Sequence, residues 1–201
     1  MSNKTKDTAK SKALKWFAKQ GWEVHAFQKA AIDAYLAGKG GLVNAPTGSG
    51  KTYSLAIPSI VSHNPKKKGI HLLWITPLRS LATEIQEAIA TAANSLDCNW
   101  HVAIRNGDTS TKERTRQKKE IPQCLVTTPE SLHLLLAQKK HDDPFKNLDA
   151  VVVDEWHELL GSKRGVQTEL AISRLKHINP KLKVWGISAT IGNLQQAMEV
   201  L

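Results

Sequence analysis

The 201-residue sequence contains only two cysteines, Cys98 and Cys124, and they lie too far apart to form a Cys-x-x-Cys metal or redox site. No stretch approaches the roughly 18 apolar residues of a membrane-spanning helix. Residues 1–12 are polar and lysine-rich, without the apolar segment of a secretory signal. The eight histidines are scattered without metal-ligand spacing. We therefore expect reduced thiols, no zinc, no membrane partner and a cytoplasmic location.

Acidic residues are scarce relative to basic ones: the chain has 18 Asp and Glu but 28 Lys and Arg, which gives a formal net charge of +10. Such an excess favours an acidic partner such as nucleic acid, although many basic runs are simply solvated. We interpret residues 1–13 as a flexible basic arm and residues 14–201 as one α/β domain, because the length suits a single core.

The segment from Ala45 to Thr52 has the features of a phosphate-binding loop. Residues 42–44 are expected to form a short buried strand before it, and Lys51 and Thr52 to open a helix whose N–H groups favour an anion. Ala45 replaces the first glycine of the simplest pattern, and an ordinary Gly/Ser turn is the alternative. The residues expected to bind the phosphates of ATP are Thr47, Gly48, Ser49, Gly50, Lys51 and Thr52.

Asp154 and Glu155 follow Ala150–Val153, an apolar, β-branched run typical of a strand buried on both faces. Unpaired buried charge is costly, so adjacent acids there indicate a site rather than core. Together with Lys51 they would be catalytic: Asp154 and Thr52 would hold Mg²⁺, and Glu155 would polarise the attacking water. A solvated strand end with two surface acids is the alternative.

Strand and helix signals alternate along the chain, which predicts a three-layer α/β domain with a mostly parallel, doubly wound sheet. Ligands of such sheets gather at the carboxyl ends of the strands. Helical spacing marks segments around 14–18, 27–35, 78–92, 110–120, 132–136 and 171–178. Strands are expected at 42–44, 72–76, 101–105, 124–128, 150–153 and 184–188. Polar residues directly after these strands are candidates for contacts with a nucleic-acid backbone: Thr76, Pro77, Arg79, Arg105, Thr109, Thr128 and Pro129.

These motifs, in this order, resemble the first RecA-like motor domain of superfamily 2 helicases. The run Asp154-Glu155-Trp156-His157 through Gly165 is similar to the large helicase-related (Lhr) group, and 44–52 with 128–133 are most like the bacterial ligase-associated DEXH helicases. The resemblance implies ATP-dependent, 3′-to-5′ movement on single-stranded DNA in DNA repair. It also implies a second RecA-like domain that 201 residues do not include, and a repair ligase and nuclease as possible partners. We expect the isolated chain to be weakly active at best.

The resemblance assigns further roles to individual residues. His157, Ser188 and Thr190 would couple hydrolysis to strand binding, and Gln28 would recognise adenine. The alternatives are a helix-start histidine with a local hydrogen bond and a surface glutamine.

Two other classes of function stay open from the sequence. One is a P-loop ATPase without nucleic-acid function, and the other is a non-catalytic nucleic-acid-binding module. The strand-end motifs argue against the first, and the intact residues Lys51, Thr52, Asp154 and Glu155 argue against the second.

Overall fold

The protein is described by a computed structural model over residues 3–138 and 142–189. Its centre is a six-stranded sheet in the order β1-β6-β5-β2-β4-β3, in which every strand pair is parallel. The predicted α/β fold is confirmed, and the predicted strand ends agree with the structure to within one residue. The strands are β1 (Gly41–Asn44), β2 (Leu72–Ile75), β3 (Val102–Arg105), β4 (Cys124–Thr127), β5 (Ala150–Val153) and β6 (Lys183–Ser188).

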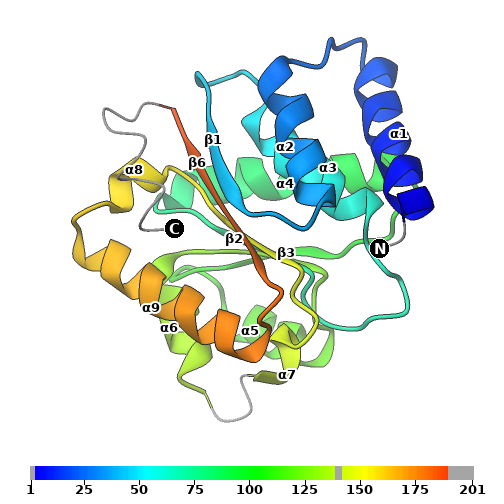
Figure 1. Ribbon diagram of the computed structural model, residues 1–201. Helices are drawn as coiled ribbons and strands as arrows, with labels where there is room; N and C mark the ends of the chain where they lie inside the picture. The colour runs from blue at the N-terminus through cyan, green and yellow to red at the C-terminus, as the bar shows by residue number, and fades with distance from the viewer. Residues whose placement is uncertain (1–2, 139–141, 190–201) are drawn as a thin grey trace.

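Helices cover both faces of the sheet. Figure 1 shows α1 to α4 on one face and α6, α7 and α9 on the other. Two separate apolar clusters correspond to these faces, one centred on Trp74 and Ile89 and the other on Leu73 and Trp156. The helices are α1 (Asn3–Lys19), α2 (Ala26–Leu36), α3 (Lys51–Val61), α4 (Arg79–Ser95), α5 (Thr111–Lys119), α6 (Pro129–Leu136), α7 (Asp142–Phe145), α8 (Trp156–Leu159) and α9 (Lys163–Ile178).

The structure departs from the expected flexible arm over residues 1–13. Residues 3–13 belong to α1, where Ala9 and Ala13 are buried and Lys10 forms an ion pair with Asp33 of α2. Small side chains allow α1 to approach its neighbours closely, so a segment that is polar in composition still buries one face. The short helices α7 and α8 were also not predicted, because a four-residue helix carries no periodic pattern.

Parallel pairing brings distant residues to one edge of the sheet. At the carboxyl ends of the strands, Asn44 pairs with Ser188, Val153 pairs with Gly186, and Ile75 pairs with both Val153 and Thr127. The loops that follow these strands therefore emerge side by side. Within the part of the chain that the structure describes, no helix is long and apolar enough to cross a membrane.

Substitution of Trp16 tests whether α1 packs onto the rest of the domain. Its ring is 4% exposed, contacts Phe17, Trp22 and Tyr53, and donates a hydrogen bond from Nε1 to Ser95 Oγ at 2.6 Å. Trp16→Ala should lower the free energy of unfolding by about 3–5 kcal/mol because it removes a buried ring. Urea unfolding of the chain measures the loss.

Ser95→Ala is the matched control, since it keeps the Trp16 ring and removes only the hydroxyl that accepts from Trp16 and donates to the carbonyl oxygen of Ala92. It should cost about 1 kcal/mol. If Trp16→Ala costs no more than this control, α1 is not docked as described.

Candidate nucleotide and nucleic-acid site

The phosphate loop joins β1 to α3 in a conformation that depends on glycine. Gly48 and Gly50 have φ values of +79° and +77°, and Gly50 is the N-cap residue of α3. The amide of Ser49 and its hydroxyl both donate to the carbonyl oxygen of Pro46. Lys51 is buried, and its Nζ donates to the carbonyl oxygen of Ala45 at 2.7 Å. This hydrogen bond joins the end of the loop to its beginning. Thr47 is exposed and Thr52 is half-buried.

Gln28 holds the phosphate loop from the side of α2. Its side chain is 3% exposed, and Nε2 lies 3.3 Å from the carbonyl oxygen of Ser49 and 3.2 Å from that of Gly50. A Cβ atom at position 50 would lie 2.8 Å from this nitrogen. The Oε1 atom accepts from the amide of His25, which caps α2. Gln28 is thus neither a surface residue nor free, and its internal bonds set the position of the loop.

A cavity of about 400 Å³ lies beside the loop and Gln28. Aromatic rings form part of its wall, and Trp22 is 47% exposed although it contacts both Trp16 and Tyr53. A planar base can stack on such a wall. Sequence reasoning missed the aromatic lining residues Phe17, Trp22 and Tyr53, whose aromatic character near the loop was the available signal.

Asp154 lies at the end of β5 with both carboxylate oxygens hydrogen-bonded. Oδ1 accepts from the amide of Glu155 at 3.0 Å, and Oδ2 accepts from Trp74 Nε1 at 3.3 Å. Burial raises the pKa of Asp154 to about 6, and the charge of Glu155 adds to the rise, while Trp74 and Lys51 oppose it. The carboxylate is therefore held in one orientation at an energetic cost that a cation would relieve.

Glu155 begins the turn into α8 with a left-handed backbone, φ 46° and ψ 47°. Its Oε2 atom is buried without a hydrogen-bond partner among the described residues and lies 3.4 Å from Nδ1 of His157. The same Nδ1 is 2.9 Å from Ser188 Oγ at the end of β6. The structure thus brings His157 and Ser188 together beside the second acid, whereas Thr190 lies outside the described residues.

The donor set fits a magnesium ion. Burial penalises the charge of the Asp154 carboxylate, Thr52 lies in the first turn of α3, and Glu155 has a buried oxygen with no hydrogen bond among the described residues. No three of His, Cys, Asp and Glu gather in the described residues as a metal cage. Mg²⁺ needs no such cage, since it is usually held by one or two carboxylates, substrate phosphates and water.

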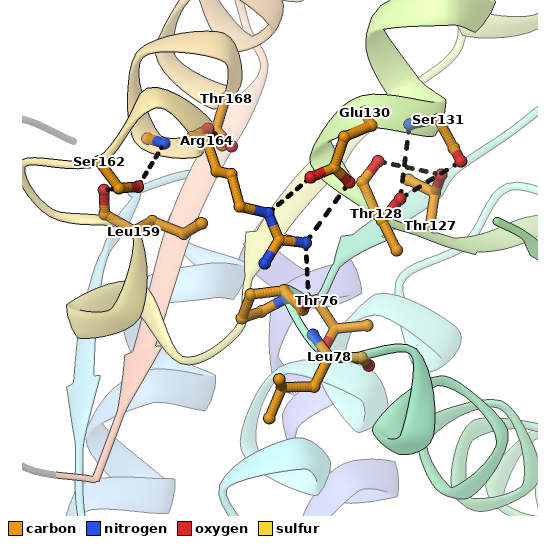
Figure 2. Close-up of polar contacts among 12 residues, drawn as sticks. Thr76, Leu78, Thr127, Thr128, Glu130, Ser131, Leu159, Ser162, Arg164 and Thr168 are labelled. Carbon is orange, nitrogen blue, oxygen red and sulfur yellow. Dashed lines mark hydrogen bonds and ion pairs between the residues drawn. The ribbon is translucent and has the colours of Figure 1, made fainter. Parts of the chain in front are cut away.

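The strand-end residues expected to contact nucleic acid lie close together, but most of their side chains face inward. Thr76, Pro77, Thr128 and Pro129 are all buried. Thr128 caps α6, where its Oγ1 accepts from the amide of Ser131, as Figure 2 shows. Buried threonines shape these loops, so contacts with a phosphodiester would come from exposed backbone amides and neighbouring side chains.

The arginine candidates differ from one another. Arg79 is exposed and pairs with Asp108 at 2.9 Å. Arg105 is 7% exposed, and its Nη1 bonds to Gln117 Oε1 at 3.2 Å, so it braces the interior instead of facing a ligand. Thr109 is half-buried; its hydroxyl accepts from the amide of Asn106 and lies 3.3 Å from the carbonyl oxygen of Ile104. Sequence alone does not separate an exposed arginine from one that braces a loop.

Asp154→Asn tests whether burial of the Asp154 carboxylate makes protein stability depend on pH. The folded pKa of about 6 exceeds the ordinary 3.8, so the folded state binds the proton more tightly than the unfolded state. Its contribution to stability is present below the unfolded pKa and is lost as pH rises through 6. In magnesium-free buffer, the stability of the wild type relative to Asp154→Asn should fall by about 2–3 kcal/mol between about pH 4 and pH 8.

Urea unfolding at each pH measures this difference, and Glu169→Gln on the exposed face of α9 is the control. If the difference in free energy of unfolding between wild type and Asp154→Asn stays constant with pH, the pKa of Asp154 is not raised by burial as described.

Comparisons with known proteins agree with this geometry. The family model for the DEAD/DEAH box helicase matches residues 25–197. The ATP-dependent helicase Lhr-Core of Methanothermobacter thermautotrophicus is 32% identical over 92% of this chain and 23% of its own length. The Lhr helicase/uracil glycosylase of Escherichia coli is 29% identical over 88% of this chain and 13% of its own.

A solved structure of the Mycobacterium smegmatis helicase Lhr bound to ssDNA and AMP-PNP superposes with a TM-score of 0.79 at 29% identity, over 90% of this chain and 24% of that chain. This chain therefore spans about a quarter or less of the length of these relatives. The family model covers most of the chain, including the phosphate loop, the acids and the strand-end loops. The chain belongs to the DEAD/DEAH box helicase family.

Proposed function

We propose that this chain is the ATP-hydrolysing motor domain of a nucleic-acid helicase that couples ATP turnover to movement along single-stranded DNA. The observation that carries the proposal is the convergence of the phosphate loop, Asp154 and Glu155 at one edge of the sheet, beside the loops that follow β2 and β4. Nucleotide chemistry and strand binding would then share one surface.

ATP would bind with its base in the aromatic cavity and its phosphates over the loop. Residues 48–50 lead into the start of α3, where free N–H groups and the helix dipole favour anions. Lys51 would exchange the carbonyl oxygen of Ala45 for phosphate oxygens. Thr52 and Asp154 would hold Mg²⁺, which supplies charge neutralisation at the phosphates when bound.

Glu155 would orient the attacking water and accept its proton. Its buried Oε2 makes no hydrogen bond among the described residues, and His157 Nδ1 lies 3.4 Å from it. His157 joins Glu155 to Ser188 on β6, so a change at the acid can reach the neighbouring strand. Gln28 would sense the nucleotide through the two loop carbonyls it contacts.

The charge of +10 and the exposed Arg79 support a nucleic-acid substrate. The solved structure of the Mycobacterium smegmatis helicase Lhr is bound to ssDNA, which supports single-stranded DNA in particular. We extend the proposal to the Lhr group and its ligase-associated branch, to 3′-to-5′ polarity, and to DNA repair in the bacterial cytoplasm. A second RecA-like domain would complete the ATP site, and a repair ligase and nuclease are the partners that this branch implies.

Glu155→Gln tests the catalytic assignment in the full-length protein. The amide cannot accept the proton, so the ATP hydrolysis rate with single-stranded DNA should fall by about 10²- to 10⁴-fold. Binding of a non-hydrolysable ATP analogue should be retained, because the phosphate loop is unchanged. Phosphate release and fluorescence titration measure the two quantities.

Glu169→Gln removes a carboxylate on an exposed face of α9 and should hydrolyse ATP like the wild type. Undiminished hydrolysis in Glu155→Gln would refute the assignment of Glu155. A wild-type rate that neither single-stranded DNA nor RNA increases would refute the helicase proposal and favour an ATPase without nucleic-acid function.

A further inference from the structure

Arg164, in the first turn of α9, connects the two loops that follow β2 and β4. Figure 2 shows its guanidinium between them. Nε donates to Glu130 Oε1 at 2.6 Å, Nη2 lies 3.4 Å from Glu130 Oε2, and Nη2 donates to the carbonyl oxygen of Pro77 at 2.7 Å. One side chain thus contacts both loops that are expected to hold a nucleic-acid strand.

The Arg164 guanidinium contacts both carboxylate oxygens of Glu130. A guanidinium that forks onto both oxygens of a carboxylate fixes orientation as well as distance. Partial burial raises the pKa of Glu130, but the hydrogen bonds and charge of Arg164 outweigh it, and the net pKa lies below the ordinary value. Exposed ion pairs contribute little to stability, so the main consequence of this one is the placement of the loops.

A short segment with several internal hydrogen bonds joins Arg164 to Asp154 and Glu155. After the left-handed Glu155, α8 ends at Leu159, whose carbonyl oxygen accepts from the amide and hydroxyl of Ser162. Ser162 in turn caps α9 by accepting from the amide of Gly165 at 3.0 Å. A Cβ at position 165 would overlap with the carbonyl oxygen of Leu159, so glycine permits this close junction.

We propose that Arg164 is a positioning residue that couples the ATP site to strand binding. It would hold Pro77 and Glu130, and so the two strand-binding loops, in a fixed relation to the segment that carries Asp154 and Glu155. When nucleotide binding shifts that segment, the two loops move with it. The inference rests on the proposed function, because it concerns how the same motor links its two ligands.

Glu130→Gln distinguishes positioning from electrostatics, because the two predict opposite changes in DNA affinity. Glu130→Gln removes a negative charge from the strand-binding surface, so a purely electrostatic surface would bind DNA more tightly. Loss of the link would instead misplace the loop after β4 and weaken binding. Arg164→Gln should be the more severe variant, since it also loses the contact with Pro77.

The experiment compares full-length wild type, Arg164→Gln, Glu130→Gln and the double variant. Anisotropy titration of a labelled oligo-dT strand, with a non-hydrolysable ATP analogue and Mg²⁺ present, gives the dissociation constant. We expect about fivefold or greater weakening in both single variants, within the usual range of coupling between sites. The double variant should resemble Arg164→Gln, because the two residues act through one contact.

Lys163→Gln is the matched control. It removes a positive charge from the adjacent, exposed residue of the same helix turn, and should bind the strand within about twofold of wild type. The salt dependence of binding gives a second readout. A residue that only positions loops leaves the slope of log K against log salt unchanged in Arg164→Gln, whereas a direct phosphate contact lowers it by about one.

Wild-type or tighter binding by Glu130→Gln would overturn the inference, as would equal weakening by Lys163→Gln and Arg164→Gln or a reduced salt slope in Arg164→Gln. Thermal unfolding identifies a variant that fails to fold. If Arg164→Gln does not fold, Glu130→Gln still tests the inference, because the side chain of Glu130 is exposed. Failure of the wild type to bind the strand at all would refute the proposed function itself.

Discussion

Parallel pairing of β6 between β1 and β5 is the constraint on which the site depends. The register that sets Asn44 opposite Ser188 and Val153 opposite Gly186 brings three loops from distant parts of the chain to one edge. A slip of one residue would turn every side chain of a strand to the opposite face. The buried apolar side chains on both faces therefore fix the position of the phosphate loop relative to the acids.

The two faces of the sheet serve the site in different ways. On one, Phe17 of α1, Trp22 of the α1–α2 loop and Tyr53 of α3 line the cavity beside the phosphate loop, and Gln28 of α2 contacts that loop. On the other, Arg164 in the first turn of α9 contacts Glu130 and Pro77, which belong to the segments after β4 and β2. Under the proposed function, nucleotide and strand would be contacted from opposite layers, at the carboxyl-terminal edge of the sheet.

The sequence predicted the strands and the identity of the nucleotide motifs, because short β-branched runs and a Gly-x-Gly-Lys-Thr loop have strong local signals. It did not predict that α1 begins at residue 3, since the burial of Ala9 and Ala13 depends on neighbours distant in sequence. It did not separate Arg79, which is exposed, from Arg105, which is buried. It also missed Arg164, whose partners lie 34 and 87 residues away. Local pattern determines elements, whereas the role of a polar side chain depends on tertiary partners.

In the proposed motor, the nucleotide site and the strand-binding site are coupled through one edge of the sheet. Isothermal titration of the full-length protein with a non-hydrolysable ATP analogue and Mg²⁺, with and without saturating single-stranded DNA, tests this coupling most directly. Coupling predicts that DNA tightens nucleotide binding by about fivefold or more, and that the nucleotide tightens DNA binding by the same factor. Identical nucleotide affinities in the two titrations would contradict the account.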